Sequence, residues 1–301
     1  MKVVKSCAMS PWRVYLTLAF GIACISTSSI LVKYLGSREI DFLAIAFYRL
    51  LFATLLTALP FITNICSELR DFNSKKAVLL FLSGLCLALH FGTWTLSLGY
   101  IPVARSVLLV TCHPILTAMA SYIFLGEPFS RRNLAASLVA FCGVVVILLE
   151  SVGEFGSESG LLVGDVLALC GAVAIVGYIV LGRRLRSEIG LASYTAAVYA
   201  VSSAVLFLPT AFAGVWPWTL GRAEYFWLVV LALVPTIGGH TVFNYLLKDV
   251  SASLVSTAFL GEPVGAALLA WAIWGQIPSI YTLVGGILVM VGIYLVKLEL
   301  R

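Results

Sequence analysis

Charged residues are scarce in this 301-residue chain. They make up only 11% of it, whereas 61% of the residues are hydrophobic and the mean hydropathy is +1.06. Soluble domains contain about 25% charged and about 45–50% apolar residues. A compact fold in water could not cover this much apolar surface with polar side chains. The scarcity of charge therefore excludes a soluble fold and indicates a protein that resides in lipid.

Motifs for catalysis and metal binding are also missing. The chain has only three histidines, no HExxH, GxSxG or GxxxxGK[ST] sequence, and no CxxC pair among its seven cysteines. We therefore expect no catalytic residue, no metal site and no cofactor, and we keep an intramembrane enzyme only as an alternative. The net charge of +5 is spread over short loops, which argues against nucleic acid as a partner.

Long apolar runs are abundant. A helix needs about 20 mainly apolar residues to cross about 30 Å of hydrocarbon. The runs are unbroken instead of alternating with period two, which favours helices over a barrel. We predict an all-α integral membrane protein with ten transmembrane helices. The predicted spans are residues 12–35, 42–63, 77–99, 102–125, 133–149, 161–182, 191–213, 225–247, 250–273 and 279–297.

Lysine and arginine fall unevenly on the two sides of these spans. With the N-terminus in the cytoplasm, fourteen of the nineteen lie inside and three outside, while Arg49 and Arg105 lie within spans. Such an excess marks the cytoplasmic side of membrane proteins. We predict a multi-pass protein of the cell membrane (plasma or inner), with both termini cytoplasmic and residues 1–11 as a short cytoplasmic N-terminus.

The two halves of the chain share a register. Residues 98–150 align with residues 247–299 without a gap, at an offset of 149, and an offset of 150 relates the first and sixth spans. Because each half contains five spans, an odd number, the second half must be inverted. We predict two inverted five-helix repeats, residues 12–150 and 161–299. The pairs that set the register are Pro114/Pro263, Gly126/Gly275, Gly143/Gly292 and, at offset 150, Lys33/Arg183.

Several short segments in these positions resemble one family. They are Ser97 to Ala104, His113-Pro114 and Leu125-Gly126-Glu127 in the first half, Glu262-Pro263, Gly275 and Gly285-Gly286 in the second, and Arg49 after Ala46-Phe47-Tyr48. Their order and spacing are similar to those of the ten-helix EamA-type members of the drug/metabolite transporter superfamily. Family members often carry Gly-Glu where this chain has Gly275-Gln276, and we expect little loss from that difference.

The resemblance implies secondary transport by alternating access, through a central cavity between the repeats, with helices five and ten at the periphery. The solute would be a small metabolite such as an amino acid, nucleoside, vitamin or drug-like compound, and export is plausible. A channel or a non-catalytic membrane scaffold stays an alternative, although no selectivity ring is visible. As partners we expect the solute and the bilayer, and we leave open a proton or counter-substrate and a homodimer.

Two mid-span pairs, His113-Pro114 and Glu262-Pro263, are the strongest candidates for the solute site. Proline removes a backbone donor and interrupts a helix, and buried ionisable groups in membranes usually face a cavity. We predict helix breaks at Pro114 and Pro263, with Glu262 binding a cationic group or a proton and His113 facing it. The alternative is that Glu262 bonds to a neighbouring helix and the prolines only bend the bundle.

Other polar residues within spans are weaker candidates. Arg49 could anchor an anion or pair with a polar group on another helix. His90/Trp94 and His240/Asn244 are each four residues apart and so share a helix face, which suits either a cavity or packing; Tyr48 is a further candidate. We expect Arg105 to reach the lipid headgroups and Asp165 to be solvated.

Overall fold

The computed structural model describes residues 9–70, 72–128, 130–149, 161–212, 220–275 and 277–296. These residues contain helices and no strand. Nine of the helices in this part of the chain are long and apolar enough to cross a membrane, and Ile280–Leu295 is a shorter apolar helix. The prediction of an all-α membrane protein of about ten helices is confirmed.

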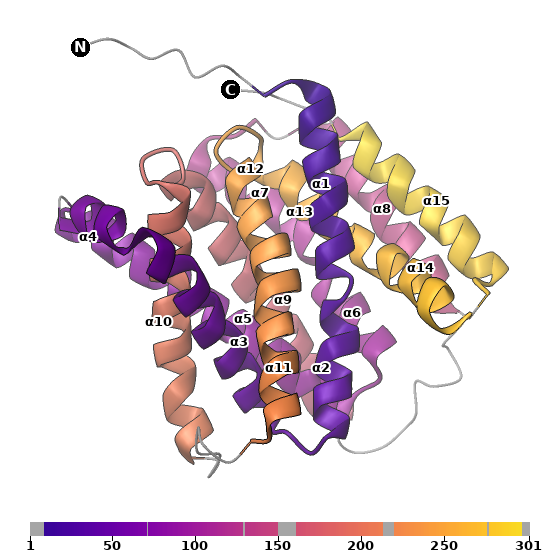
Figure 1. Ribbon diagram of the computed structural model, residues 1–301. Helices are drawn as coiled ribbons and strands as arrows, with labels where there is room; N and C mark the ends of the chain where they lie inside the picture. Colours follow the sequence, from indigo (N-terminus) through magenta and orange to yellow (C-terminus); the bar gives the residue numbers. More distant parts are fainter. Residues whose placement is uncertain are drawn as a thin grey trace.

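The helices form a bundle with an upper face, where α1 begins and α15 ends, and a lower face, where α2 ends and α11 begins (Figure 1). The first five spans are α1 (Pro11–Ile25) with α2 (Ser28–Ser37), α3 (Phe42–Ala58) with η1 (Leu59–Phe61) and α4 (Ile62–Arg70), α5 (Ser74–Tyr100), α6 (Val103–Val110) with α7 (His113–Leu125), and α8 (Arg131–Leu148). The remaining five are α9 (Leu161–Leu185), α10 (Leu191–Phe212), α11 (Arg222–Leu231) with η3 (Ala232–Thr241) and α12 (Val242–Leu246), α13 (Ala252–Ala258) with η4 (Phe259–Gly261) and α14 (Glu262–Trp274), and α15 (Ile280–Leu295).

Four spans are interrupted near their middle. Pro114 and Pro263 are each the second residue of a new helix, α7 and α14, where the missing N–H costs no hydrogen bond. Pro235 lies inside η3, which is a π-helix. Between α1 and α2 there is no proline. There the hydroxyls of Ser26 and Thr27 bond back to the carbonyls of Ile22 and Cys24, both at 2.7 Å, a bonding pattern that bends helices.

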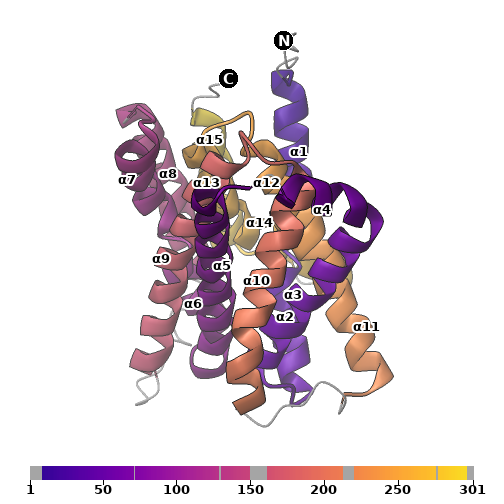
Figure 2. The ribbon, with the colours of Figure 1, turned by 90° about the vertical axis from the view of Figure 1, so that its left-hand side faces the viewer.

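The fourth and ninth spans are interrupted at corresponding places. His113 and Leu125 bound α7, and the residues 149 positions later, Glu262 and Trp274, bound α14. Each helix then ends at a glycine with positive φ, Gly126 at 64° and Gly275 at 68°, a conformation that glycine adopts without strain. From the middle of the bundle α7 rises to the upper face, whereas α14 descends (Figures 1 and 2).

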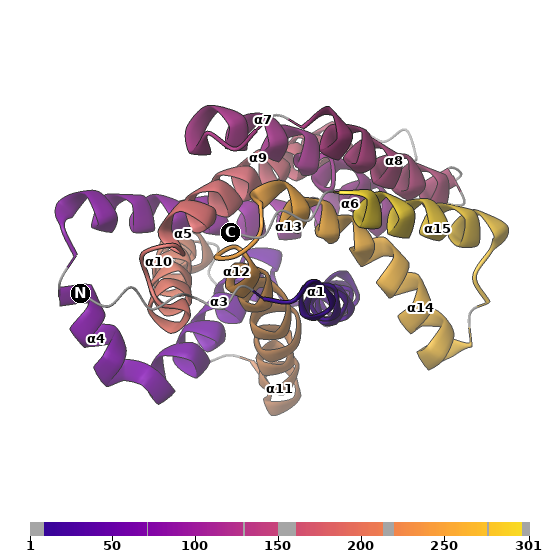
Figure 3. The same cartoon turned by 90° about the horizontal axis from the view of Figure 1, so that it is seen from above.

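Helices α8 and α15 lie side by side at one edge of the bundle (Figure 3). Glycines allow their backbones to meet, because a Cβ atom at Gly143 would lie 2.5 Å from the carbonyl oxygen of Gly285. A Cβ at Gly292 would likewise lie 2.5 Å from the backbone nitrogen of Ala140. Small residues are what membrane helices use for such close contacts. The two helices thus form a tightly packed pair at the edge of the bundle, and α8 also contributes Ile147 and Leu148 to the site described below.

Candidate solute-binding site

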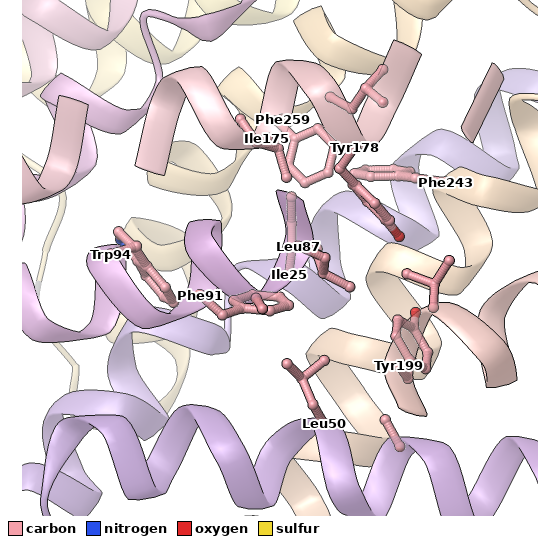
Figure 4. Close-up of a cluster of buried hydrophobic side chains, with 14 of the residues drawn as sticks. Ile25, Leu50, Leu87, Phe91, Trp94, Ile175, Tyr178, Tyr199, Phe243 and Phe259 are labelled. Atoms are coloured by element: carbon pink, nitrogen blue, oxygen red, sulfur yellow. The ribbon is translucent and has the colours of Figure 1, made fainter. Parts of the chain in front are cut away.

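A cluster of buried aromatic and aliphatic side chains fills the centre of the bundle (Figure 4). It includes Phe91 and Trp94 from α5, Tyr178 from α9 and Phe259 from η4. Within it lies an enclosed cavity of about 30 Å³. That volume has room for about one or two water molecules. The lining residues are Ile25, Ser28, His90, Phe91, Trp94, Val110, Thr111, His113, Ile175, His240, Phe259 and Glu262.

A larger space, which we call the vestibule, reaches the lower face. Its volume is about 690 Å³, within the range of small-molecule sites. Its lining residues are Ser29, Lys33, Leu98, Gly99, Tyr100, Ile101, Pro102, Val103, Val107, Ile147, Leu148, Glu262, Pro263 and Ala266. Of the described residues, Glu262 is the one that lines both the vestibule and the enclosed cavity.

Glu262 begins α14 and separates the two spaces. The carboxyl oxygen Oε1 is fully buried and has no hydrogen-bond partner among the described residues. No ion pair within 4.0 Å involves Glu262 in this part of the chain. The alternative in which Glu262 bonds to a neighbouring helix is therefore not what the structure contains. A buried oxygen without a partner is costly, so this carboxyl is a candidate to bind a hydrogen-bond donor or a cation.

His113 lies at the start of α7 and lines the enclosed cavity. The ring nitrogen Nδ1 lies 2.8 Å from the Ser256 hydroxyl of α13, which in turn donates to the Thr117 hydroxyl at 3.0 Å. His113 therefore ties the start of α7 to α13. The interruptions of the fourth and ninth spans therefore meet at the cavity.

The Arg49 guanidinium is fully buried beside the cavity. Nε donates to the Thr236 hydroxyl at 2.7 Å and Nη1 to the Ser28 hydroxyl at 2.9 Å. The guanidinium carbon lies 3.9 Å from the centre of the Phe91 ring, close enough for a cation–π interaction. Nη2 has no partner among the described residues. Arg49 thus pairs with polar groups on other helices, as one alternative predicts, and keeps one donor free.

His90, Trp94 and His240 all line the enclosed cavity. The His90 ring is stacked on the Trp94 ring, with centroids 6.3 Å apart, and Nδ1 lies 2.9 Å from the Gly171 carbonyl oxygen. The His90 and His240 rings are also 6.3 Å apart. The His240 Nδ1 and the Trp94 Nε1 are buried and have no partner within the described ranges of the chain. All three histidines of the chain therefore converge on this cavity, although no described group of His, Cys, Asp and Glu side chains could hold a metal ion.

Asn244 and Tyr48 do not line either space. Asn244 lies behind His240, donating to the His240 carbonyl at 2.8 Å and to the Tyr178 hydroxyl. Tyr48 packs against Phe52 and Tyr225, with ring centroids 5.9 and 5.8 Å away. Asn244 therefore contacts a residue that lines the cavity, whereas Tyr48 belongs to a part of the central cluster that lines neither space.

Arg105 and Asp165 have a partner that the sequence did not indicate. The two residues form an ion pair, with Nε to Oδ1 at 2.7 Å and Nη2 to Oδ2 at 2.5 Å, and both side chains are half-buried. A bidentate pair of this kind joins α6 to α9 near the lower face. Each side chain is partly exposed and is held by the other. The sequence position of either residue alone gives no sign of this pairing.

Several residues that line the enclosed cavity were not singled out from the sequence, among them Ser28, Thr111 and Phe259. Ser28 begins α2, while Thr111 and Phe259 lie in the interruptions of the fourth and ninth spans. The sequence does give a signal for Thr111 and Phe259, because each lies three or four residues before a mid-span proline, Pro114 or Pro263. Ser28 follows the interruption without proline, so the apolar pattern gives no warning of it.

Comparison with known proteins yields one family and several relatives. The EamA-like transporter family matches residues 12–149 and 162–298. An uncharacterized transporter of Archaeoglobus fulgidus is 27% identical over 287 residues, covering 94% of this chain and 96% of that protein. A solved structure titled "Crystal structure of protein" has a TM-score of 0.78 at 21% identity, covering 95% of this chain and 96% of that one, and so has the same fold.

Two further relatives are named with a solute. The S-adenosylmethionine uptake transporter of Rickettsia prowazekii is 24% identical over 277 residues, covering 88% of this chain and 85% of that protein. A probable terminal-alkyne amino-acid exporter of Streptantibioticus cattleyicolor is 29% identical over 205 residues, covering 66% of this chain and 65% of that protein.

Proposed function

Because the chain belongs to the EamA-like transporter family, we propose that it moves a small solute with a cationic group by alternating access, using Glu262 as the binding residue. One observation carries this proposal: Glu262 alone lines both the vestibule and the enclosed cavity, and it presents a buried carboxyl oxygen without a partner. Transporters bind solutes at such mid-membrane helix interruptions. A cation or a proton arriving from the vestibule would complete the site.

The nature of the vestibule favours a solute that is partly apolar. Among its lining residues only Lys33 and Glu262 are charged, and the walls are mainly aliphatic and aromatic. The two relatives named with a solute point the same way, because S-adenosylmethionine and an amino acid both carry an amino group. The free Nη2 of Arg49 lies deeper and would suit a carboxylate once the enclosed cavity expands.

The arrangement of the chain in the membrane is part of the proposal. We infer that residues 12–150 and 161–299 are two inverted repeats, supported by the bounds of α7 and α14, which recur 149 residues apart. The excess of Lys and Arg supports a cytoplasmic upper face. The open vestibule then faces outward, and exchange or a proton would drive the solute from one side to the other.

Reconstituted flux tests the role of Glu262. Liposomes containing the full chain are loaded with an amino acid or S-adenosylmethionine, and exchange of the labelled compound is followed at several pH values. We expect saturable, counter-substrate-stimulated exchange that Glu262→Gln abolishes and Glu262→Asp retains in part. The matched control is Glu224→Gln, since that carboxylate pairs with Arg38 at the lower face and should not affect exchange.

Two results would change the proposal. Full exchange by Glu262→Gln at every pH would contradict the role of Glu262. Unsaturated electrical conductance in place of saturable exchange would favour a channel. The relatives' names support a transporter over an enzyme, and the flux measurement separates transport from consumption because the labelled compound is recovered unchanged.

A further inference from the structure

The upper face is closed by one guanidinium that joins three segments. Arg183, at the end of α9, donates from Nε to the Glu127 carboxylate at 3.0 Å. Its Nη1 donates to the carbonyl oxygens of Leu247 at 2.6 Å and Lys248 at 2.9 Å. Glu127 follows α7, and Leu247 and Lys248 connect α12 to α13. The Arg183 and Glu127 side chains are only 5% and 7% exposed, so solvent screens this pair little.

The closure separates a pocket on the upper face from the solute site. That pocket, of about 450 Å³, is lined by Glu127, Arg183 and Lys248 among others, and it shares no lining residue with the enclosed cavity. The vestibule on the lower face, in contrast, reaches Glu262. The structure is therefore open to the lower face and shut to the upper one.

The open vestibule is lined by the residues of the first half that correspond to this closure. An offset of 150 relates Arg183 to Lys33, and an offset of 149 relates Leu247 and Lys248 to Leu98 and Gly99. Lys33, Leu98 and Gly99 all line the vestibule. Lys33 is exposed, and it forms no ion pair with any described residue. The corresponding positions are thus joined by hydrogen bonds on the upper face, whereas on the lower face they line an open space.

The correspondence fails at one position. Glu127 is related by the offset of 149 to Gln276, which lies outside the described residues, so this comparison is one of sequence alone. A glutamine amide can accept a hydrogen bond from an ammonium group, but it cannot supply the opposite charge.

We propose that Arg183 and Glu127 are the ionic latch of the upper mouth, and that Lys33 closes the lower mouth against Leu98 and Gly99 without an ionic partner. This inference rests on the proposed alternating access. A two-state protein populates the conformation whose contacts are stronger. The unequal latches then make the lower-open conformation the resting state, and the solute must overcome that preference during each cycle.

Two cysteine reporters at corresponding positions measure the equilibrium without any solute. Val103 lines the vestibule, and Ala252, 149 residues later, is fully buried. Val103→Cys and Ala252→Cys are each introduced into the full chain after its seven native cysteines are replaced. The rate of maleimide labelling in liposomes is then compared. We expect rapid labelling at position 103 and slow labelling at position 252.

The latch variants should shift this ratio in a defined direction. Glu127→Gln removes the buried negative charge that faces Arg183, which is strongly unfavourable, so labelling at 252 relative to 103 should rise at least about tenfold. Gln276→Glu supplies Lys33 with a partner and should raise the same ratio. The matched control is Glu188→Gln. Glu188 lines the same upper pocket but pairs with Lys76 in an exposed bridge, and Lys76 lowers the pKa of that carboxyl by this contact.

The outcomes separate the latch from the proposed function. A ratio that neither Glu127→Gln nor Gln276→Glu changes would overturn the latch, even if saturable flux is found. If Glu127→Gln fails to fold, Gln276→Glu still decides the question, because it adds a group at a position that the observed closure does not use. Alternating access requires that labelling falls at one position when it rises at the other. If the rates at 103 and 252 never change in opposite directions, alternating access is overturned as well. Absence of flux for the chosen solutes would leave the latch result standing.

Discussion

Replacing Glu262 by glutamine should stabilise the protein while it removes solute binding. In the solute-free structure the Glu262 Oε1 is buried and has no hydrogen-bond partner among the described residues. A buried polar atom left without a partner costs about 1–3 kcal/mol, and more when it is charged. Glutamine has the same shape and is still polar, but it carries no charge. Glu262→Gln should therefore recover only the part of the cost that arises from the charge, about 1 kcal/mol. Binding residues often carry such a cost, since function and stability compete at the same site.

Thermal unfolding in detergent measures this effect directly. A gain of about 1 kcal/mol raises the midpoint of a chain of this size by roughly 2–4 °C, so Glu262→Gln should unfold several degrees above the parent when no solute is present. Adding a transported amine should raise the midpoint of the parent only, because ligand binding stabilises the state that binds it. A midpoint for Glu262→Gln that lies below the parent's in the absence of solute would refute the reasoning. That result would mean that the carboxylate already has a stabilising partner.

Two further substitutions test the packing around the site. Arg49→Lys should lower the midpoint by the equivalent of about 1–3 kcal/mol, because an ammonium group cannot bond both hydroxyls and stack on the ring as the guanidinium does; the exposed Arg222→Lys is the control, and equal midpoints would contradict the assignment. Gly285→Ala should destabilise the contact of α8 with α15 by about 1–3 kcal/mol, since the new Cβ would lie 2.5 Å from the Gly143 carbonyl oxygen. Gly286→Ala, whose Cβ would lie 3.5 Å from Val264, should be tolerated, and equal destabilisation by both would contradict the close contact.

Hydropathy predicted the spans because a membrane imposes a minimum length on each apolar run. It could not predict their direction or their interior. The second span, predicted to end at residue 63, continues through η1 to Arg70 in α4, which leaves the bundle past Pro60 (Figure 2). The interruption at Ser26 and Thr27 arises from hydroxyls that bond their own helix. The apolar pattern cannot predict this interruption, because serine and threonine also occur in unbroken helices.

The members of the candidate site were easier to predict than their partners. A spacing of four places His90 with Trp94 on one face of α5, and both do line the enclosed cavity. Whether that face meets His240 depends on how α5 packs against η3, which the sequence of either helix leaves open. The pairing of Arg105 with Asp165 spans 60 positions and depends on contact between α6 and α9. Side chains within a helix were therefore predictable, and contacts between helices were not.

The two halves of the chain differ chemically where they agree in backbone geometry. Positions 149 apart keep proline at the second residue of α7 and α14 and glycine with positive φ at their ends. The first residue of each helix, however, is His113 in one and Glu262 in the other. In the proposed alternating-access cycle, the shared backbone provides two similar ways to open, one toward each face. The proposed latch then breaks that equality, so that a few charges on a nearly symmetric frame decide the direction in which the chain prefers to open.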